Sequence, residues 1–497
     1  MFASFHNLKP FQLIEYICMA LLAYVMPISW RIATYVMAAL FVSAVLKGIF
    51  EEGFAPNPKQ CNNKAVYVVF IAFWVMYAVS FLYSDNSAEA RLQIGKKLSF
   101  LLFPIFFLCS NLSYLNKERV KTVVWCMILG MFSLFVMNFI WAIYDILFNE
   151  NGIDRLISPY KFFKTDEIIF PYVHRGYFSM MTGIALVFCV VDMFSDKPSM
   201  SRIFGIISII FLVFMPFFLA SRAGILCTVL LLFILWIWIT FVRKEKKIGI
   251  LSGVVILCSL VIGYFMFPDS VERITDAVDS AKNRKGDCRI TIRNGNRALL
   301  ADSFVTGVGI GDRGDETLES YERYKDEIES EMLPPANVDV DFYVNSRKIL
   351  LDSIHAKFGN KCTAEVYEYI DSVAEADAID YSSVKENIPE YQMIKHCIRY
   401  ELNAHNQYYD TIMDIGLIGL VLLLGFFVVP IYLWIKNKNF DIAMFSLLFI
   451  VAFNCLFESV FERQMGIVFF AFFYLLLSHY AFCADNNKYD KSLDVKQ

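Results

Sequence analysis

The sequence has little charge and only one long hydrophilic stretch. Charged residues make up 19% of its 497 positions, and the formal net charge is −4, which is too small to indicate a nucleic-acid-binding protein. Instead, 57% of the residues are hydrophobic and 16% are aromatic, with a mean hydropathy of +0.50. A soluble domain is usually about 45–50% apolar. The composition therefore predicts a membrane protein and no nucleic-acid partner.

Signals for export processing and for metal binding are also missing. The start of the chain has no strongly basic segment and no clear small-residue cleavage site, so we expect a retained first helix. Most cysteines lie inside apolar runs, where cysteine behaves as a small hydrophobe. Cys288, Cys362 and Cys397 lie in the hydrophilic stretch, and none has the spacing of a metal site such as C-x-x-C. We expect no metal, no cofactor and at most one disulfide.

Apolar runs of about 20 residues, the length that crosses a bilayer, recur along the chain. They predict an all-α polytopic membrane protein with about twelve transmembrane helices. The fourth run contains Pro104 and is expected to be short and bent. The expected spans are 11–29, 31–50, 65–83, 97–111, 122–148, 174–194, 202–220, 223–242, 248–267, 410–435, 441–458 and 464–484.

Lysine and arginine in the short loops set the expected orientation. With the N-terminus in the cytoplasm, the basic cluster RKEKK at 243–247 and most other loop lysines and arginines fall inside. An even number of spans then places both ends of the chain inside. The expected parts are the first nine helices in 1–267, a large and mostly helical periplasmic loop in 268–407, and the last three helices with a cytoplasmic tail in 408–497.

Unusual polar residues lie at the outer ends of the expected spans. Arg222 lies in SRAG, between two apolar runs, where a charge is costly unless it faces a polar cavity or snorkels to headgroups. His405 heads the tenth span, and its ring titrates near neutral pH, as suits a general base. Asn406 beside it could orient the ring or bind a sugar hydroxyl. Asp410 and Asp414 follow, and their simplest interpretation is a favourable interaction with the helix dipole.

The expected outer loop begins with basic residues. Arg289, Arg293 and Arg297 recur at the spacing of one helix face, and guanidinium groups bind phosphate oxygens in a bidentate manner. The alternative is a solvated face, which we favour for Arg297. The glycine-rich TGVGIGD at 306–312 lacks the lysine and serine or threonine of a phosphate-binding loop. We interpret it as a turn that brings the backbone close to the membrane face.

Other span ends carry polar residues on the same expected side. His174 and Arg175 open the sixth span, and Glu458, Glu462 and Arg463 join the last two. Each could be interfacial decoration alone, but together with the residues above they predict an outward-facing cationic cavity roofed by the large loop. A lipid-linked diphosphate would fit it, with the apolar tail among the helices. Because no ATP is present outside the cell, the donor itself must hold the energy for a transfer. Arginines would stabilise the departing phosphate, and a base would take the acceptor proton.

The ordered set SRAG at 221–224, Arg289, FVTGVGIGD at 304–312 and AHNQYYDTIMDIGLIGL at 404–420 resembles the O-antigen ligase family. The similarity covers about 200–460. It implies a GT-C-like fold and transfer of a glycan from undecaprenyl diphosphate to an acceptor, such as lipid A–core, at the periplasmic face of the bacterial inner membrane. The reaction would be metal-independent and inverting.

The same resemblance implies roles for individual residues. Arg222, Arg289 and His405 would be catalytic. Many members have an aromatic residue where this chain has Arg293, so the choice between Arg289 and Arg293 as the key loop arginine stays open. The candidate substrate-binding residues are Arg293, Asn406, His174, Arg175 and Glu458.

Three other functions are open to a chain of this kind. One is an O-antigen or exopolysaccharide polymerase that joins lipid-linked repeat units, and another is a protein O-oligosaccharyltransferase. The third is a transporter or flippase, which more often shows broken mid-span helices, repeats and ionisable residues near the midplane. Here the polar residues lie mainly at span ends, which favours a transferase. The sequence does not set the sugar, the acceptor or the oligomeric state.

Overall fold

The structure, a computed structural model, describes residues 8–53, 64–148, 174–195, 198–219, 221–267, 299–323 and 404–482, with positions 271, 275, 296 and 297. All regular elements in these residues are helical. The first are α1 (Pro10–Val25), α2 (Trp30–Lys47), α3 (Lys64–Ser80), α4 (Ser87–Lys97), α5 (Ser99–Cys109) and α6 (Lys117–Phe148). Then come α9 (Arg175–Met193), α10 (Arg202–Phe218), α11 (Arg222–Ile237), α12 (Lys246–Met266), α15 (Arg313–Arg323), α20 (Gln407–Asn437), α21 (Ile442–Asn454) and α22 (Gln464–Phe482).

Length and hydropathy identify the membrane helices. In the described part of the chain, nine helical stretches are long and apolar enough to cross a membrane, and three further apolar helices, α1, α10 and α21, are shorter. The chain is therefore an all-α, multi-pass membrane protein. Each span expected from the sequence overlaps one of these stretches. Their full number, and the side that each end faces, stay predictions.

The fourth span is longer than its apolar run. Helix α4 starts at Ser87, where the Asn86 side chain accepts a hydrogen bond from the Glu89 amide, and with α5 it forms one apolar stretch, Ser87–Cys109. The prediction of a short fourth span is therefore wrong. The added segment, SAEARLQIGKK, is too polar to stand out by hydropathy, yet its asparagine cap and strong helix formers favour a helix.

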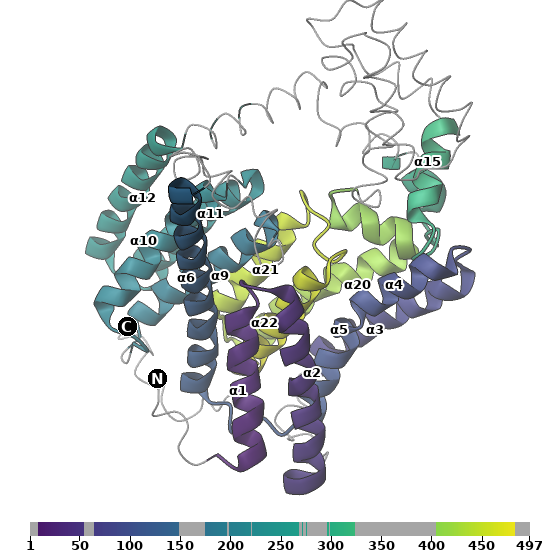
Figure 1. The fold of residues 1–497 in the computed structure, drawn as a ribbon, viewed down its shortest axis with the longest axis horizontal. Helices are drawn as coiled ribbons and strands as arrows, with labels where there is room; N and C mark the ends of the chain where they lie inside the picture. Colours follow the sequence, from purple (N-terminus) through teal and green to yellow (C-terminus); the bar gives the residue numbers. More distant parts are fainter. Residues whose placement is uncertain are drawn as a thin grey trace, which may run out of the picture.

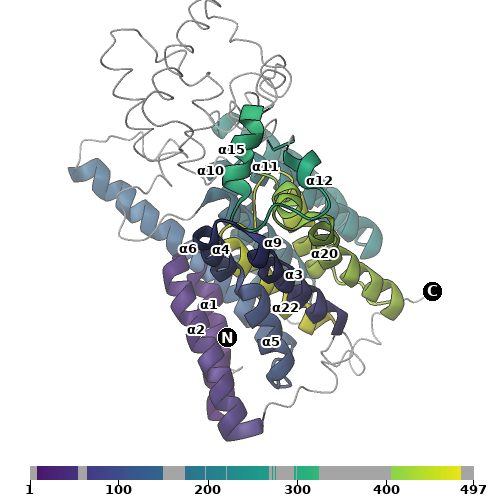
Figure 2. The ribbon, with the colours of Figure 1, turned by 90° about the vertical axis from the view of Figure 1, so that its right-hand side faces the viewer.

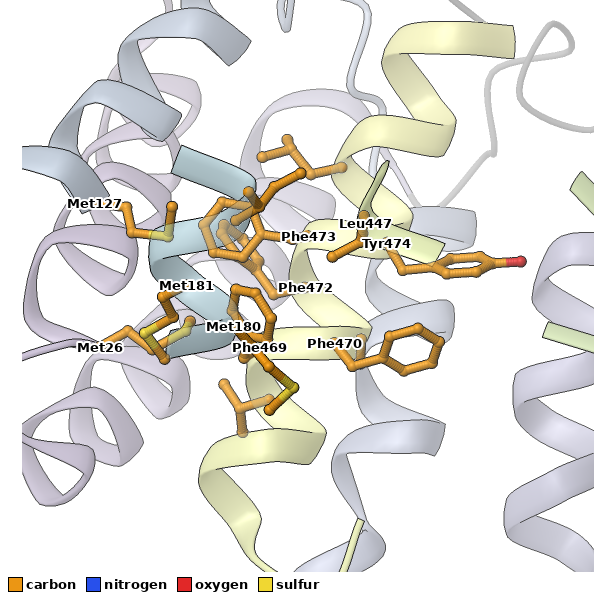
Figure 3. Close-up of a cluster of buried hydrophobic side chains, with 14 of the residues drawn as sticks. Met26, Met127, Met180, Met181, Leu447, Phe469, Phe470, Phe472, Phe473 and Tyr474 are labelled. Atoms are coloured by element: carbon orange, nitrogen blue, oxygen red, sulfur yellow. The ribbon is translucent and has the colours of Figure 1, made fainter. Parts of the chain in front are cut away.

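Helices α9 and α22 form the centre of the bundle, where 89% of each apolar stretch is buried, against 11% for α12 at the edge. Figure 1 shows α12 and α10 on one flank, and α3, α4, α5 and α20 on the other. Figure 3 shows how the centre is filled: Met180 and Met181 of α9 and Met127 of α6 lie beside the phenylalanines of α22. Flexible thioethers fill the gaps between rigid rings.

An aromatic cluster fixes α20 against its neighbours. The ring of Phe70 on α3 lies 4.5 Å from that of Phe426 on α20, 5.9 Å from that of Phe100 on α5 and 5.7 Å from that of Phe470 on α22. All four side chains are fully buried. Such pairs contribute about 0.5–1.5 kcal/mol each beyond area burial. The cluster therefore holds the helix that begins just after His405.

The predicted large outer loop, 268–407, is described mainly over 299–323. There α15 lies beyond the ends of α4 and α20, as both views show (Figure 1, Figure 2). The structure also describes positions 271, 275, 296 and 297 and residues 404–407 of this loop, whereas the predicted site residues Arg289 and Arg293 lie outside the described residues.

Candidate functional site

Several predicted site residues lie at the first turns of helices. His174 caps α9, because its ring nitrogen Nδ1 accepts a hydrogen bond from the Gly176 amide at 3.3 Å, and Arg175 is the first residue of that helix. Ser221 caps α11 through its hydroxyl, and Arg222 is the first residue there. Helix N-termini carry partial positive charge. Each arginine therefore adds its charge to that of a helix end.

Close packing brings the starts of α9 and α11 together. A β-carbon on Gly224 would stand 2.6 Å from both side-chain atoms of Ser179, so only glycine fits at this contact. One turn earlier in α9, a β-carbon on Gly176 would lie 3.6 Å from Cγ of Glu458. The start of α9 thus contacts both the start of α11 and the connection from α21 to α22.

The same connection reaches His405. The His405 ring nitrogen Nδ1 lies 3.4 Å from Oε2 of Glu458, and both side chains are partly buried, at 15% and 21% exposed. His405 adopts a left-handed backbone conformation, with φ of +47°, directly before α20. When Nδ1 carries the proton and faces the carboxylate, Nε2 is the basic nitrogen of the ring. This is the arrangement that a general base needs.

Asn406 is the N-cap residue of α20. Its side-chain oxygen accepts hydrogen bonds from the amides of Tyr408 and Tyr409, at 3.0 and 3.2 Å, and so caps α20. Its side-chain nitrogen donates to the Leu456 carbonyl at 3.3 Å. Glu458, and not Asn406, contacts the His405 ring. The expected role in orienting the ring therefore belongs to Glu458, while a role for Asn406 in sugar binding stays a prediction.

One run of contacts thus links the predicted site residues that the structure describes. It passes from His405 to Glu458, then to the start of α9 with His174 and Arg175. From there it crosses the contact of α9 with α11, which begins at Arg222.

A buried charge cluster, which the sequence patterns did not predict, lies beside this run of contacts. Nη1 of Arg313 donates to both oxygens of Asp414 at 3.0 Å and lies 3.5 Å from Oδ1 of Asp410, while Nη2 donates to Glu462 at 2.8 Å. Nζ of Lys97 lies 3.1 Å from the other oxygen of Glu462. Arg313 is 6% exposed and Lys97 is fully buried. Asp410 and Asp414 therefore pair with Arg313, and the interpretation as partners of the helix dipole alone is wrong.

Burial and opposite charge compete in this cluster. Burial alone would raise the pKa of the Glu462 carboxyl, but Arg313 and Lys97 hold that pKa well below its usual range. Burial likewise would lower the pKa of Arg313, and Asp414, Glu462 and Asp410 raise it well above its usual value. Glu462 and Arg313 are therefore both charged. The sequence did contain a signal for the cluster, the spacing of Asp410 and Asp414. This spacing puts two carboxylates on one helix face in an apolar run, where they need a cation as partner.

The glycine-rich turn fills a break in α20. The helix is interrupted at Ile415 and Gly416, where Gly416 has φ of +67°. The Val308 amide donates to the Met413 carbonyl at 2.7 Å, the Gly309 amide to the Asp414 carbonyl at 3.2 Å, and the Leu417 amide to the Val305 carbonyl at 3.3 Å. As predicted, the turn brings backbone to the apolar helices. A broken membrane helix was not expected. The backbone N–H and C=O groups that the break leaves without helical partners bond to the glycine-rich turn, as such groups must bond within the protein in an apolar setting.

A pocket of about 130 Å³ lies next to this turn, between it and α15. Its polar lining comes from Asp302, Ser303, Thr306, Glu316 and Ser320. None of the predicted site residues lines it. Its volume is below the range of about 300–1,000 Å³ that is usual for ligand sites, so we assign the candidate site to the run of contacts through His405.

Comparison with known proteins adds no assignment. A scan against protein-family models finds no match, and a search of the curated proteins finds none either. The class that fold and hydropathy define is a multi-pass, all-α membrane protein, and its activity is inferred below from the site.

Proposed function

We propose that the protein is a glycosyltransferase of the O-antigen ligase type. It would move a glycan from undecaprenyl diphosphate to a hydroxyl of an acceptor, such as lipid A–core, at the periplasmic face of a bacterial inner membrane. The observation that carries this proposal is the contact of His405 with Glu458, next to helix ends that begin with Arg175 and Arg222. In the proposed topology the chain crosses the membrane about twelve times, with both ends in the cytoplasm.

The reaction needs one base and a site for a departing diphosphate. The acceptor oxygen attacks the anomeric carbon of the donor sugar, and the bond between that carbon and the diphosphate oxygen breaks, with inversion. Nε2 of His405 takes the proton of the acceptor hydroxyl while Glu458 holds the ring through Nδ1. The diphosphate leaves with its lipid and carries away the negative charge.

In this proposal, positive charge would stabilise the leaving group. Arg175 and Arg222 each open a helix, so two arginines and two helix N-termini lie at the same end of the bundle. Preorganised charge of this kind stabilises charge that develops in a transition state, typically by about 2.7–4 kcal/mol for each donor removed. Energy for the transfer comes from the donor, so the proposed mechanism needs no nucleotide.

The test is complementation of a strain that lacks the gene. We expect the wild-type chain to restore full-length surface glycan, and His405→Ala and Arg222→Ala to leave bare acceptor with polymer still on the lipid carrier. Arg202→Ala is the matched control, because Arg202 opens α10 as Arg222 opens α11, but at the opposite end by the predicted topology. Wild-type glycan levels with His405→Ala would remove the catalytic role. Single repeat units on the acceptor in the deletion strain would indicate a polymerase.

A further inference from the structure

Arg313 contacts both segments that carry the His405–Glu458 pair. Through Nη1 it reaches Asp410 and Asp414 in the first turns of α20, which begins directly after His405 and Asn406. Through Nη2 it reaches Glu462, which lies with Glu458 in the short connection between α21 and α22. One planar guanidinium group therefore bridges the segment of the ring and the segment of its carboxylate partner.

Further hydrogen bonds carry this link to the backbone on either side of His405. The oxygen of Asp410 that lies 3.5 Å from Arg313 also accepts a hydrogen bond from the Ala404 amide at 2.9 Å, and Ala404 precedes His405. Gln407 joins the two segments a second time, because its side-chain oxygen accepts from the Phe461 amide at 2.6 Å. The left-handed backbone at His405 is thus held from both sides.

The backbone that carries Arg313 is fixed as well. Asp312, the residue before it, accepts hydrogen bonds from the amides of Asp85 and Asn86 at 2.9 and 2.7 Å. The Gly311 amide donates to the Ser84 hydroxyl at 3.0 Å. The turn after α3 therefore anchors this segment on one side, and the break in α20 anchors it on the other. Arg313 acts from a fixed position, so its geometry can be passed on to the groups that it binds.

We infer that Arg313 is a positioning residue that sets the contact between His405 and Glu458. Its fork binds carboxylates from two chain segments at once, which the single ammonium of a lysine cannot reproduce. Lys97 holds Glu462 from the other side and would remain in an Arg313 variant. The structural part of this inference stands alone, and its meaning for catalysis rests on the proposed function.

The experiment observes the His405 ring directly. Protein labelled with ¹³C,¹⁵N-histidine is reconstituted in lipid and studied by magic-angle-spinning NMR at alkaline pH, where imidazole is neutral. The chain has only six histidines, and the signals lost in His405→Gln identify the ring of interest. In the wild-type protein we expect one tautomer, with the proton on Nδ1 facing Glu458. In Arg313→Lys we expect a mixture of tautomers, as in Glu458→Ala.

A matched control separates positioning from general loss of stability. Lys121→Gln breaks a different, partly buried pair, the 3.0 Å contact of Lys121 with Asp192, and should leave the His405 signals unchanged. If Arg313→Lys does not accumulate in membranes, Glu462→Gln takes its place, since it keeps the side-chain shape and removes one negative charge from the cluster. A single wild-type tautomer in whichever of these two variants is measured would overturn the inference.

Transfer assays then address the proposed function separately. Arg313→Lys should lower kcat by about 10- to 100-fold, the range for a small misplacement of a catalytic group, with the donor KM nearly unchanged. A tautomer mixture together with undiminished transfer by His405→Ala would retain the positioning role and refute the transferase role of His405. Reduced transfer by His405→Ala with an unaltered tautomer in Arg313→Lys would support the transferase role of His405 and refute the positioning role of Arg313.

Discussion

Gly307 lies directly against the backbone of Asp414: a β-carbon on Gly307 would stand 2.6 Å from the carbonyl carbon and oxygen of Asp414. The opposite contact is as close, since a β-carbon on Gly416 would collide with the Val305 carbonyl. Gly307 and Gly416 thus allow the backbone of the glycine-rich turn to enter the break in α20. The break places Asp414 where Arg313 reaches it.

The first prediction concerns Gly307→Ala. Gly307 has φ of +73°, and the new methyl group would meet backbone that cannot rotate away. We expect the variant to lose about 2–4 kcal/mol of stability from strain and displacement together. Thermal unfolding in detergent measures the loss. Gly95→Ala is the control, because a β-carbon there meets nothing within 4 Å and alanine favours a helix interior. Equal melting temperatures for the two variants would contradict the close contact.

The second prediction concerns the contact between α9 and α11. In Gly224→Ala the methyl group would collide with Ser179, push the helix starts apart and displace Arg222. We expect transfer to fall by about tenfold or more. Ser179→Gly in the same chain removes the two nearest colliding atoms and leaves Oγ of Ser221 at 2.9 Å. It should restore part of the lost rate, so the two changes should be non-additive. Kinetics of the four members of this cycle provide the measurement, and simple additivity would exclude the contact as the cause.

The third prediction uses the pKa of Glu462. Arg313 and Lys97 depress this pKa below its value in the unfolded chain, of about 4.3, so the carboxylate stabilises the fold above that pH. The stabilisation is lost as the pH falls from about 4.3 through the depressed folded-state pKa. Glu462→Gln should therefore unfold at a lower temperature than the wild type at neutral pH, and the difference should shrink in acid. Glu118→Gln, at an exposed position in the first turn of α6, should show no such trend. A difference independent of pH would contradict the ionic role.

The fourth prediction concerns sidedness. Single cysteines are placed at Ala301 and Lys247, both exposed, in a chain whose native cysteines are replaced. A membrane-impermeant maleimide added to intact spheroplasts should label position 301 and not position 247, because the proposed topology puts them on opposite sides. Labelling of position 247 alone would place the segment after α12 in the cytosol and end the proposal of a periplasmic site.

Hydropathy predicted the helices well, because a span must be apolar along its length whatever it packs against. The same rule explains the error at 87–97, where a polar sequence continues a membrane helix. The sequence also predicted that one end of the bundle holds His174, Arg222, His405 and Glu458. Charged residues in a membrane protein avoid the apolar centre.

Pairing was not predictable in the same way. The bond between Arg313 and Asp414 joins positions 101 residues apart, and that between Lys97 and Glu462 joins positions 365 apart. Arg313 follows a glycine-rich turn in a polar segment, where an exposed side chain is the usual outcome. Its segment is held near the carboxylates by the turn after α3 and by the break in α20. Both sets of contacts join distant parts of the chain, so local sequence patterns do not predict them.

The most direct measurement is transfer by the purified protein in liposomes that contain an undecaprenyl-diphosphate-linked glycan and a lipid A–core acceptor. We predict that the wild-type chain forms glycosylated acceptor and releases an equal amount of undecaprenyl diphosphate, while His405→Ala forms neither above background. Equal product from both chains, or no product with any lipid-linked donor, would contradict the assignment of this site as a glycan transferase.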